Sequence, residues 1–259
     1  MRANEAIWTQ GIEPMSERQL VRHVGRALMY AAGLAVGAYA AYAGSTYLRY
    51  GHLRRPVGDE GDTLLDRFMP VSDVVERHQE RIAAPAEITF AALCDVDPQQ
   101  SSLVRAIFKG RELILGSEPD SSKRPRGLLA LTQTLGWRVL AEIPGREVVL
   151  GAVTQPWKAN VVFRGLAPDT FADFNEPDYV KIVWNLRADP VGLNESIART
   201  ETRVATTDPA ARRKFRRYWS IFSPGIILIR RATLHLAKRE AERRLPERVR
   251  SATRQSRMA

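Results

Sequence analysis

The chain has 259 residues, of which 44% are hydrophobic and 26% are charged, and these values are ordinary for one globular domain with extensions. Its net charge of +10 is uneven, because the stretch from Pro209 onward holds 15 Lys and Arg against 3 Asp and Glu. Basicity is therefore a property of the C-terminal part and not of the whole surface. The single cysteine, Cys94, excludes an intrachain disulfide.

The first feature along the chain is an uncharged run. Residues 1–26 are a polar N-terminal segment, and residues 27–48 contain no formally charged side chain. A run of 22 residues is long enough to cross a hydrocarbon core of about 30 Å as a helix. We therefore predict a transmembrane helix over residues 27–48, with an Ala-rich helix in water or on a surface as the alternative. The spacing of Gly33 and Gly37 lets two such helices approach closely, and it predicts a homodimer.

Two further segments flank the folded part. Residues 49–72 begin polar and acidic and are predicted as a linker, with a helical turn over residues 63–68. The tail over residues 245–259 is rich in arginine. Beside a membrane it would attract anionic lipid by about 1 kcal/mol for each basic residue, and a merely solubilising tail is the alternative. The free thiol and the basic tail favour a single-pass membrane protein whose main domain is cytoplasmic.

Residues 73–244 are predicted as the folded domain. Residues 74–83 alternate in polarity and carry many charges, which predicts a first strand near a sheet edge. Helices are expected from Pro85, over residues 101–108 and over residues 128–135. The period then changes to two. The later elements are expected to be a hairpin of residues 137–143 and 147–154, a strand over 157–163, a loop or short helix over 168–177, and strands over 179–187 and 196–206 joined by a turn at 189–192.

A long helix is predicted near the C-terminus. Asp208 is a good N-cap, and Pro209 suits the first helical turn. Pro224 removes a helix hydrogen bond, so a kink is expected there. The order of a strand, helices, about five strands and a long helix predicts an α+β fold with an antiparallel sheet against that helix. The helix places four rings on one face by their spacing: Phe215, Tyr218, Trp219 and Phe222.

Three segments resemble a known family. Residues 81–90, Arg-Ile-Ala-Ala-Pro-Ala-Glu-Ile-Thr-Phe, are similar to the family's junction between its first strand and first helix. Residues 137–151 resemble its first long hairpin, and residues 179–206 with the following helix resemble its last hairpin and C-terminal helix. Over residues 73–244 the chain thus resembles the START-like or SRPBCC superfamily of polyketide cyclases, lipid-transfer domains and Bet v-type allergens. The resemblance implies a helix-grip fold, in which a curved antiparallel β-sheet wraps around the long C-terminal helix.

The resemblance also implies a function. In that superfamily the sheet and the long helix enclose an apolar cavity, so we expect binding of a hydrophobic small molecule or lipid. Such pockets are mostly apolar with a few polar groups, and plain core packing is the alternative for each aromatic residue. The candidate ligand-binding residues are Trp137, Trp157, Phe163, Trp184, Trp219 and Phe222.

Polar candidates are fewer. Arg199 and Arg203 are expected on one face of the last strand with Glu201 on the other, and a solvated strand face is the preferred interpretation. Glu142 and Glu147 are interpreted as surface charges of a hairpin rather than as an acid/base pair. The four histidines lack ligand spacing, the cysteine has no activating partner, and no nucleotide-binding motif occurs. We therefore predict no metal, no cofactor and no catalytic residue.

These observations favour a membrane-tethered, non-catalytic protein that binds a hydrophobic molecule. The first alternative is a cyclase- or dehydratase-type enzyme on the same fold, which requires a polar residue aimed into the cavity. The second is an interaction module whose basic face docks on a protein or an anionic surface. Nucleic acid is disfavoured as a partner, because the basic tail lacks interleaved aromatic residues that stack on bases.

Overall fold

The structure is a computed structural model that describes residues 17–52, 61–116 and 125–245. The chain forms two compact units, Met1–Ser45 and Thr46–Ala259. The domain boundaries expected from the sequence stay predictions. The basic tail lies outside the described residues.

Helix α1 (Glu17–Arg49) makes up the described part of the first unit and continues into the second. Its span Arg22–Arg49 is exposed and is long and apolar enough to cross a membrane, a test that a signal sequence also passes. The uncharged run is therefore helical. Its insertion into a bilayer and its dimerisation through Gly33 and Gly37 stay predictions.

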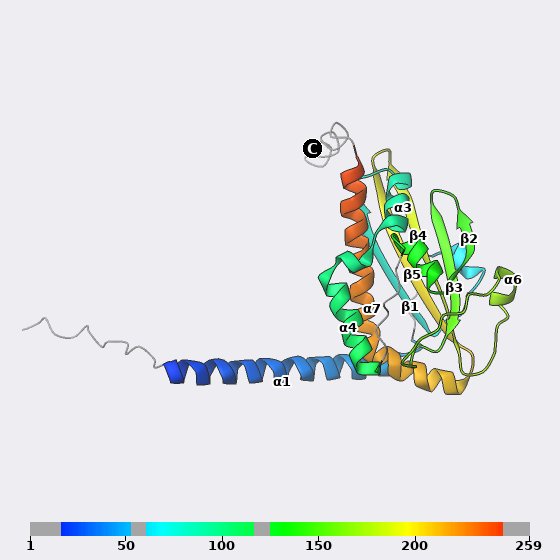
Figure 1. Cartoon of the computed structure of the whole chain (residues 1–259). Coiled ribbons are helices and arrows are strands. Elements are labelled where there is room, and N and C mark those ends of the chain that lie inside the picture. The colour runs from blue at the N-terminus through cyan, green and yellow to red at the C-terminus, as the bar shows by residue number, and fades with distance from the viewer. Residues whose placement is uncertain (1–16, 53–60, 117–124, 246–259) are drawn as a thin grey trace, which may run out of the picture. The chain divides into compact units, whose positions relative to one another are not determined.

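The second unit is built on a five-stranded antiparallel sheet with the strand order β1-β5-β4-β3-β2 (Figure 1). β1 lies at one edge, as its charges predicted, and it pairs Val74 with Val204 and Ile82 with Ser196 of β5. The hairpin β2–β3 forms the other side of the sheet, as its alternating pattern predicted. The strands are β1 (Val74–Ile82), β2 (Arg138–Ile143), β3 (Glu147–Thr154), β4 (Val180–Gly192) and β5 (Glu195–Thr206).

Side-chain caps set the starts of several helices. Asp62 Oδ1 accepts hydrogen bonds from the backbone N–H groups of Leu64 and Leu65, and Asp208 caps the last helix in the same way. Gly116 ends α4 in the left-handed conformation, which glycine adopts at little cost. The remaining helical elements are α2 (Thr63–Asp66), α3 (Ala86–Asp95), the 3₁₀ turn η2 (Pro98–Gln100), α4 (Ser102–Leu115), α5 (Leu128–Thr134), α6 (Pro168–Phe171) and α7 (Pro209–Arg244).

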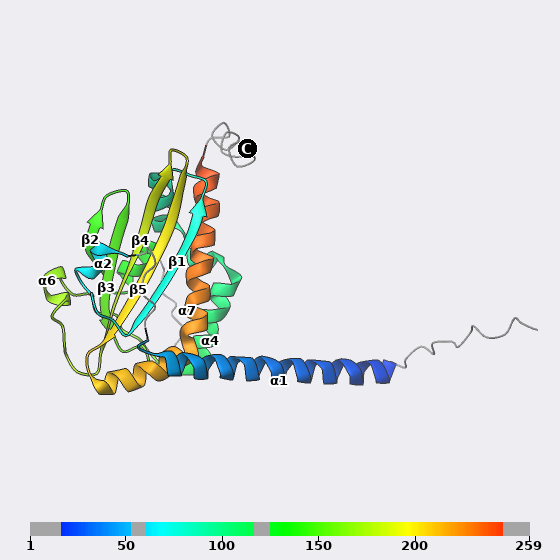
Figure 2. The ribbon, with the colours of Figure 1, turned by 180° about the vertical axis from the view of Figure 1, so that it is seen from behind.

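The sheet has two differently covered faces, because side chains alternate along each strand. On the face that we call the helix face, even-numbered residues such as Trp184 and Ala198 pack in a core with α3 and α7. On the opposite, outer face, odd-numbered residues such as Val149 and Val183 pack with Leu65 of α2. Figure 2 shows the sheet from behind, with α2 on this second side. The arrangement is the helix-grip fold that the sequence predicted.

Helix α7 is continuous from Pro209 to Arg244 and contains Pro224. Figure 1 shows it in two limbs that run in different directions. Proline cannot donate the helix hydrogen bond, and its ring crowds the preceding turn, which accounts for a bend. The predicted kink is thus present. We call residues 209–223 the first limb and residues 224–244 the second limb.

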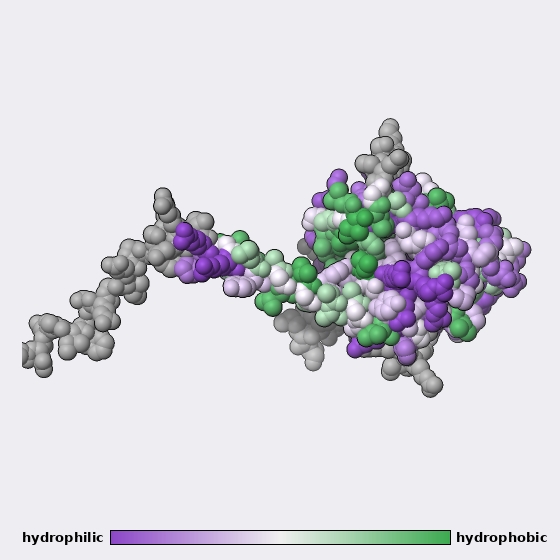
Figure 3. Space-filling view, turned by 90° about the horizontal axis from the view of Figure 1, so that it is seen from below, coloured by the Kyte–Doolittle hydropathy of each residue, from purple (hydrophilic) through white to green (hydrophobic). Residues whose placement is uncertain are grey.

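Helix α4 packs against α7 and leaves apolar side chains in solvent. The contact is close, because a Cβ atom on Gly225 of α7 would lie 2.9 Å from Ile107 Cγ2. Leu103 and Phe108 of α4 are exposed. Figure 3 shows hydrophobic residues, in green, gathered in one area of this surface of the domain.

Two predictions about local structure are wrong. Residues 157–163 form no strand; the chain turns there, and Val153 makes an isolated bridge with Arg164. The turn predicted at 189–192 is also wrong, because β4 continues to Gly192. The pairing of β4 with β3 ends at Arg187, so Pro190 removes no hydrogen bond from that ladder.

Candidate functional site

The buried core on the helix face is divided into two clusters. One surrounds Phe215 and Trp219 in the first limb of α7, and the other includes Leu234 in the second limb. Between them along α7 lie residues that are only half-buried, among them Ile226 and Arg230. The interior is therefore less completely closed at the middle of α7 than at either end.

Arg230 points its guanidinium into this middle region. Its Cζ lies 4.3 Å from the centre of the Trp184 ring, and Trp184 is 2% exposed. Within the described ranges, Arg230 has no hydrogen-bond or carboxylate partner. Burial lowers the pKa of Arg230 to about 10, so the group stays charged at neutral pH although it keeps partial exposure. A ring contact of this kind stabilises a cation by about 0.5–2 kcal/mol, and an anion would compensate the charge further.

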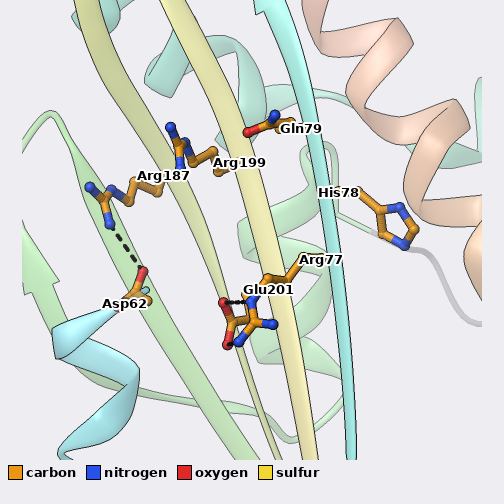
Figure 4. A pocket seen from close by; sticks show the side chains of 7 residues that line it. All are labelled: Asp62, Arg77, His78, Gln79, Arg187, Arg199 and Glu201. Carbon is orange, nitrogen blue, oxygen red and sulfur yellow. Dashed lines mark hydrogen bonds and ion pairs between the residues drawn. The ribbon is translucent and has the colours of Figure 1, made fainter. Parts of the chain in front are cut away.

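His78 of β1 lies on the same face of the sheet. Figure 4 shows its side chain directed toward α7. Burial, followed by the nearby charges of Arg230 and Arg231, lowers the pKa of His78 to about 4, so the imidazole is neutral at pH 7. Its Nε2 atom is buried and has no hydrogen-bond partner in the part of the chain that the structure describes. Glu76 Oε2 lies 3.8 Å from the same nitrogen. His78 thus offers a neutral polar group near a cation that has no carboxylate partner among the described residues.

Three of the predicted ligand-binding aromatics come together here. The ring of Trp137 lies 5.0 Å from that of Phe163 and 6.1 Å from that of Trp184. Trp137 and Phe163 are half-buried, whereas Trp184 is almost fully buried beneath Arg230. The group forms an apolar wall that reaches the guanidinium through Trp184.

The other three predicted aromatics belong to the cluster at the first limb. Trp219 packs on Phe215 at 5.9 Å, and Phe222 packs on Tyr218 at 4.9 Å. Trp157 is half-buried against the same cluster. The six residues therefore lie in two groups rather than in one. Their role in binding a ligand stays a prediction.

Arg230 and His78 were not among the residues singled out from the sequence. Arg230 was counted with the basic strip of the last helix, yet it follows Phe222 and Ile226 at intervals of four residues, on the apolar side. A charged residue at the spacing of an apolar stripe is a sequence signal for a cation that faces the interior. His78 alternates with charged neighbours in an edge strand, where the sequence gives no reason to distinguish it.

A second polar arrangement lies on the outer face, in a cavity of about 250 Å³. Figure 4 shows an ion pair of Arg77 with Glu201 and another of Arg187 with Asp62. Arg77 Nε donates to Glu201 Oε2 at 2.7 Å. The cavity is lined by Asp62, Arg77, Gln79, Arg187, Arg199 and Glu201, and by His78, whose ring is directed to the other face of the sheet.

This outer network corrects two predictions. Arg199, Glu201 and Arg203 all lie on the outer face, because side chains two residues apart in a strand point the same way. The solvated strand face is wrong for Glu201 and Arg203, each 5% exposed. Arg203 Nε donates to Glu201 Oε1 at 2.6 Å, and its Nη1 donates to Met69 O at 2.8 Å. The network thus holds the segment after α2 on the sheet.

Glu147 is also buried, at 3% exposure, so its interpretation as a surface charge is wrong, whereas Glu142 is exposed. Asn185 Nδ2 donates to Asp62 Oδ2 at 2.6 Å and to Glu147 Oε1 at 2.8 Å. Burial, and next a hydrogen bond with Asp62, raise the pKa of Glu147 to about 7. Arg77, Arg187 and the carboxyl groups here already compensate one another, so the outer cavity is a poorer anion site than Arg230.

Nucleophilic and metal chemistry receive little support from the described residues. Burial raises the pKa of the Cys94 thiol to about 12, with smaller contributions from Asp95 and Glu142, so the thiol is protonated at neutral pH. Among the residues that the structure describes, no group of three or more His, Cys, Asp or Glu side chains is placed to hold a metal ion.

Comparison with known proteins finds structures of low sequence identity. No family model matches the chain, and no curated protein matches it. Similar solved structures include norcoclaurine synthase from Thalictrum flavum with a transition-state analogue, at 11% identity and a TM-score of 0.30, covering 66% of this chain and 96% of that one. The Zhui aromatase/cyclase from Streptomyces sp. R1128 is 15% identical, with a TM-score of 0.23 and coverage of 67% and 96%. Ara h 8.0201 is 11% identical, with a TM-score of 0.17 and coverage of 61% and 99%.

The strand order, the antiparallel register and the long closing helix define a helix-grip architecture, as the sequence predicted. At these identities and TM-scores the likeness to the solved structures carries no statement about the function of this chain. The function of this chain therefore has to be argued from its own residues.

Proposed function

We propose that the chain is a membrane-tethered protein that binds an amphipathic molecule, with an apolar body and an anionic group, between the helix face of the sheet and α7. The observation that carries this proposal is the guanidinium of Arg230 on the ring of Trp184, without a carboxylate partner among the described residues. A half-buried cation of this kind favours an external anion.

The apolar part of such a ligand has a matching wall. Trp137 contacts both Phe163 and Trp184, and the rings of Trp137 and Phe163 are half-buried, whereas Trp184 lies beneath Arg230. Each 100 Å² of apolar ligand surface removed from water would contribute about 2.5 kcal/mol before the entropic cost of binding. Arg230 would fix the orientation of the ligand, because its charge lies at one end of this wall.

The membrane tether is α1. Its exposed apolar span Arg22–Arg49 supports this part of the proposal by length and composition. A tether would keep the binding domain beside a reservoir of amphipathic molecules. The orientation with the domain in the cytoplasm belongs to the same proposal.

An enzyme of the cyclase or dehydratase kind is the second candidate, and His78 is the observation in its favour. Its buried Nε2 lies 3.8 Å from Glu76 Oε2, has no hydrogen-bond partner among the described residues, and is on the side of the sheet that α7 covers. However, a histidine with a pKa of about 4 is a weak general base at neutral pH. Binding without catalysis is therefore the better supported function.

A matched pair of fluorescent probes tests the proposal. 1-Anilinonaphthalene-8-sulfonate and N-phenyl-1-naphthylamine share an aromatic body, and only the first carries a sulfonate. We expect the full chain in neutral detergent to bind both, and Arg230→Gln to weaken binding of the sulfonate about 10- to 100-fold while leaving the uncharged probe unaffected. The measurement is a fluorescence titration corrected for empty micelles.

The control is Arg231→Gln, which removes the same charge from an exposed neighbour. It should change neither affinity by more than about 2-fold, because an exposed charge is screened. Equal effects of the two variants, or no binding of either probe by the wild-type chain, would contradict the proposed function.

A further inference from the structure

The end of α1 is fixed to the first limb of α7 within the second compact unit. Arg216 Nε donates to the backbone oxygen of Tyr47 at 2.7 Å, and its guanidinium lies 3.7 Å from the centre of the Tyr47 ring. Tyr50 is buried, with its ring 6.1 Å from that of Phe215 and beneath the guanidinium of Arg212 at 5.5 Å. The last turn of α1 and the first limb of α7 therefore form one packed element.

The opposite side of the first limb is exposed and basic. Arg213, Arg217 and Ile221 recur at intervals of four residues, so they share one stripe, and all three are exposed. Two neighbouring cations differ, because Arg212 pairs with Asp73 at 2.8 Å and Lys214 pairs with Asp178 at 2.6 Å. Across the described ranges, neither Arg213 nor Arg217 has a carboxylate partner.

Apolar side chains continue this surface. Ile221 and Leu228 of α7 are 43% and 41% exposed, and Leu103 and Phe108 of the adjoining α4 are exposed as well. Figure 3 shows hydrophobic and strongly hydrophilic areas side by side on this surface of the domain. A mixture of exposed cations and large apolar side chains is typical of surfaces that lie in a membrane interface.

We propose that the first limb of α7 is a docking face for anionic phospholipid headgroups of the membrane that α1 spans. This inference rests on the membrane tether of the proposed function. The uncharged run of the chain ends at Leu48, so a spanning α1 leaves the hydrocarbon at Tyr47 to Tyr50, where tyrosine and arginine are favoured. Because these residues are packed on the first limb, Arg213 and Arg217 are held at the level of the headgroups.

Nucleic acid is a less suitable occupant of the same cations. Phosphate groups of a nucleic acid would satisfy Arg213 and Arg217 but would leave Ile221 and Leu228 in water. A lipid surface takes both kinds of side chain and lies next to the end of a helix that can span it. The two arginines should raise the affinity for an anionic surface about 10- to 30-fold.

Co-flotation of the full chain with lipid vesicles tests this inference. The vesicles contain phosphatidylcholine alone, or phosphatidylcholine with about 30 mol% of the anionic lipid phosphatidylglycerol. The measured quantity is the partition coefficient for the anionic vesicles divided by that for the neutral vesicles, and the contribution of α1 cancels in this ratio. Arg213→Ala with Arg217→Ala should lower this ratio about 10-fold or more. Arg231→Ala with Arg239→Ala removes the same charge from exposed positions of the second limb and should leave the ratio within about 2-fold of wild type.

The outcomes separate the docking face from the tether. Equal losses in the two double variants, or no loss in either, would overturn the docking face. Binding to duplex DNA that depends on Arg213 and Arg217, with no dependence on vesicle charge, would also overturn it. Failure of the full chain to float with neutral vesicles would contradict the tether instead, and the partition coefficients for the anionic vesicles would then be compared between the wild type and the two double variants.

Discussion

Arg230 and Glu147 lie on opposite faces of the sheet and differ in how their charge is compensated. Arg230 contacts the ring of Trp184 and has no carboxylate partner in the described part of the chain. Glu147 is one of two carboxyl groups bridged by the amide of Asn185. In the proposed function an external anion compensates Arg230, whereas a proton on Glu147 relieves the repulsion between the two carboxyl groups. We therefore expect Arg230 to affect ligand binding and Glu147 to affect the stability of the domain.

Glu147 should make the stability of the domain depend on pH. Burial raises its pKa in the folded state from 4.5 to about 7, so between these values the folded state binds more protons than the unfolded state. The stabilisation from this group is fully present below pH 4.5 and is lost as the pH rises through about 7. We expect a decrease on the order of 1–3 kcal/mol over this range, measured by urea unfolding at a series of pH values.

Glu147→Gln should flatten this part of the profile. Its amide oxygen can accept from Asn185 and its NH₂ group can donate to Asp62 without titrating. Glu142→Gln is the matched control, because Glu142 is an exposed carboxylate in the same hairpin. A profile for Glu147→Gln that keeps the wild-type slope between pH 4.5 and about 7 would show that this carboxyl group is not the cause.

At the level of elements, α6 and the hairpin β2–β3 meet at a glycine. A Cβ atom on Gly151 would fall on Leu140 Cδ1 and would lie 3.0 Å from Phe171 Cε2. Phe171 is fully buried, so it cannot move away without opening the outer-face core. Gly151→Ala should therefore destabilise the domain by about 1–3 kcal/mol through overpacking.

The matched control for this prediction is Gly192→Ala, at the end of β4, where an added Cβ meets no atom within 4 Å. It should change the free energy of unfolding by less than about 0.5 kcal/mol. Thermal unfolding followed by near-UV circular dichroism measures both. Equal stability of the Gly151 variant and the wild type would mean that the interface is not packed as described.

Helix α7 combines two roles through its bend. Its first limb packs on the end of α1, and its second limb carries Arg230 and Leu234 over the sheet. A straight helix could not pack on both the end of α1 and the sheet, and the bend at Pro224 allows α7 to make both contacts. The sequence predicted this kink because a proline disturbs the helix only through the turn that precedes it.

At the scale of the whole molecule, the fold was largely predictable from the sequence. The period of two in β1, β3 and β5, the cap at Asp208 and the break at Pro224 are local signals, and each led to the correct element. Residues 157–163 were wrongly predicted as a strand because five of these seven side chains are apolar. Whether a segment forms a strand depends on the strands that can pair with it, and these are distant in the sequence.

The candidate site was less predictable, because it depends on which face each side chain occupies after folding. The aromatic residues were named from the sequence, but their division into two groups depends on the packing of α7. Arg230 looked like part of a solvated basic strip, and Glu147 looked like a hairpin surface charge. Only the arrangement of α7 and α2 over the two faces of the sheet makes these two residues buried or half-buried.

A crystal structure of the full chain with 11-bromoundecanoate tests the central claim most directly, because anomalous scattering locates the bromine. We predict the bromine between the sheet and α7, beside Trp137 and Phe163, with the carboxylate oxygens about 3 Å from the guanidinium nitrogens of Arg230. A fully occupied ligand on the outer face at Arg77 and Arg187, or an interior closed around Arg230 with no ligand at saturating concentration, would contradict the account.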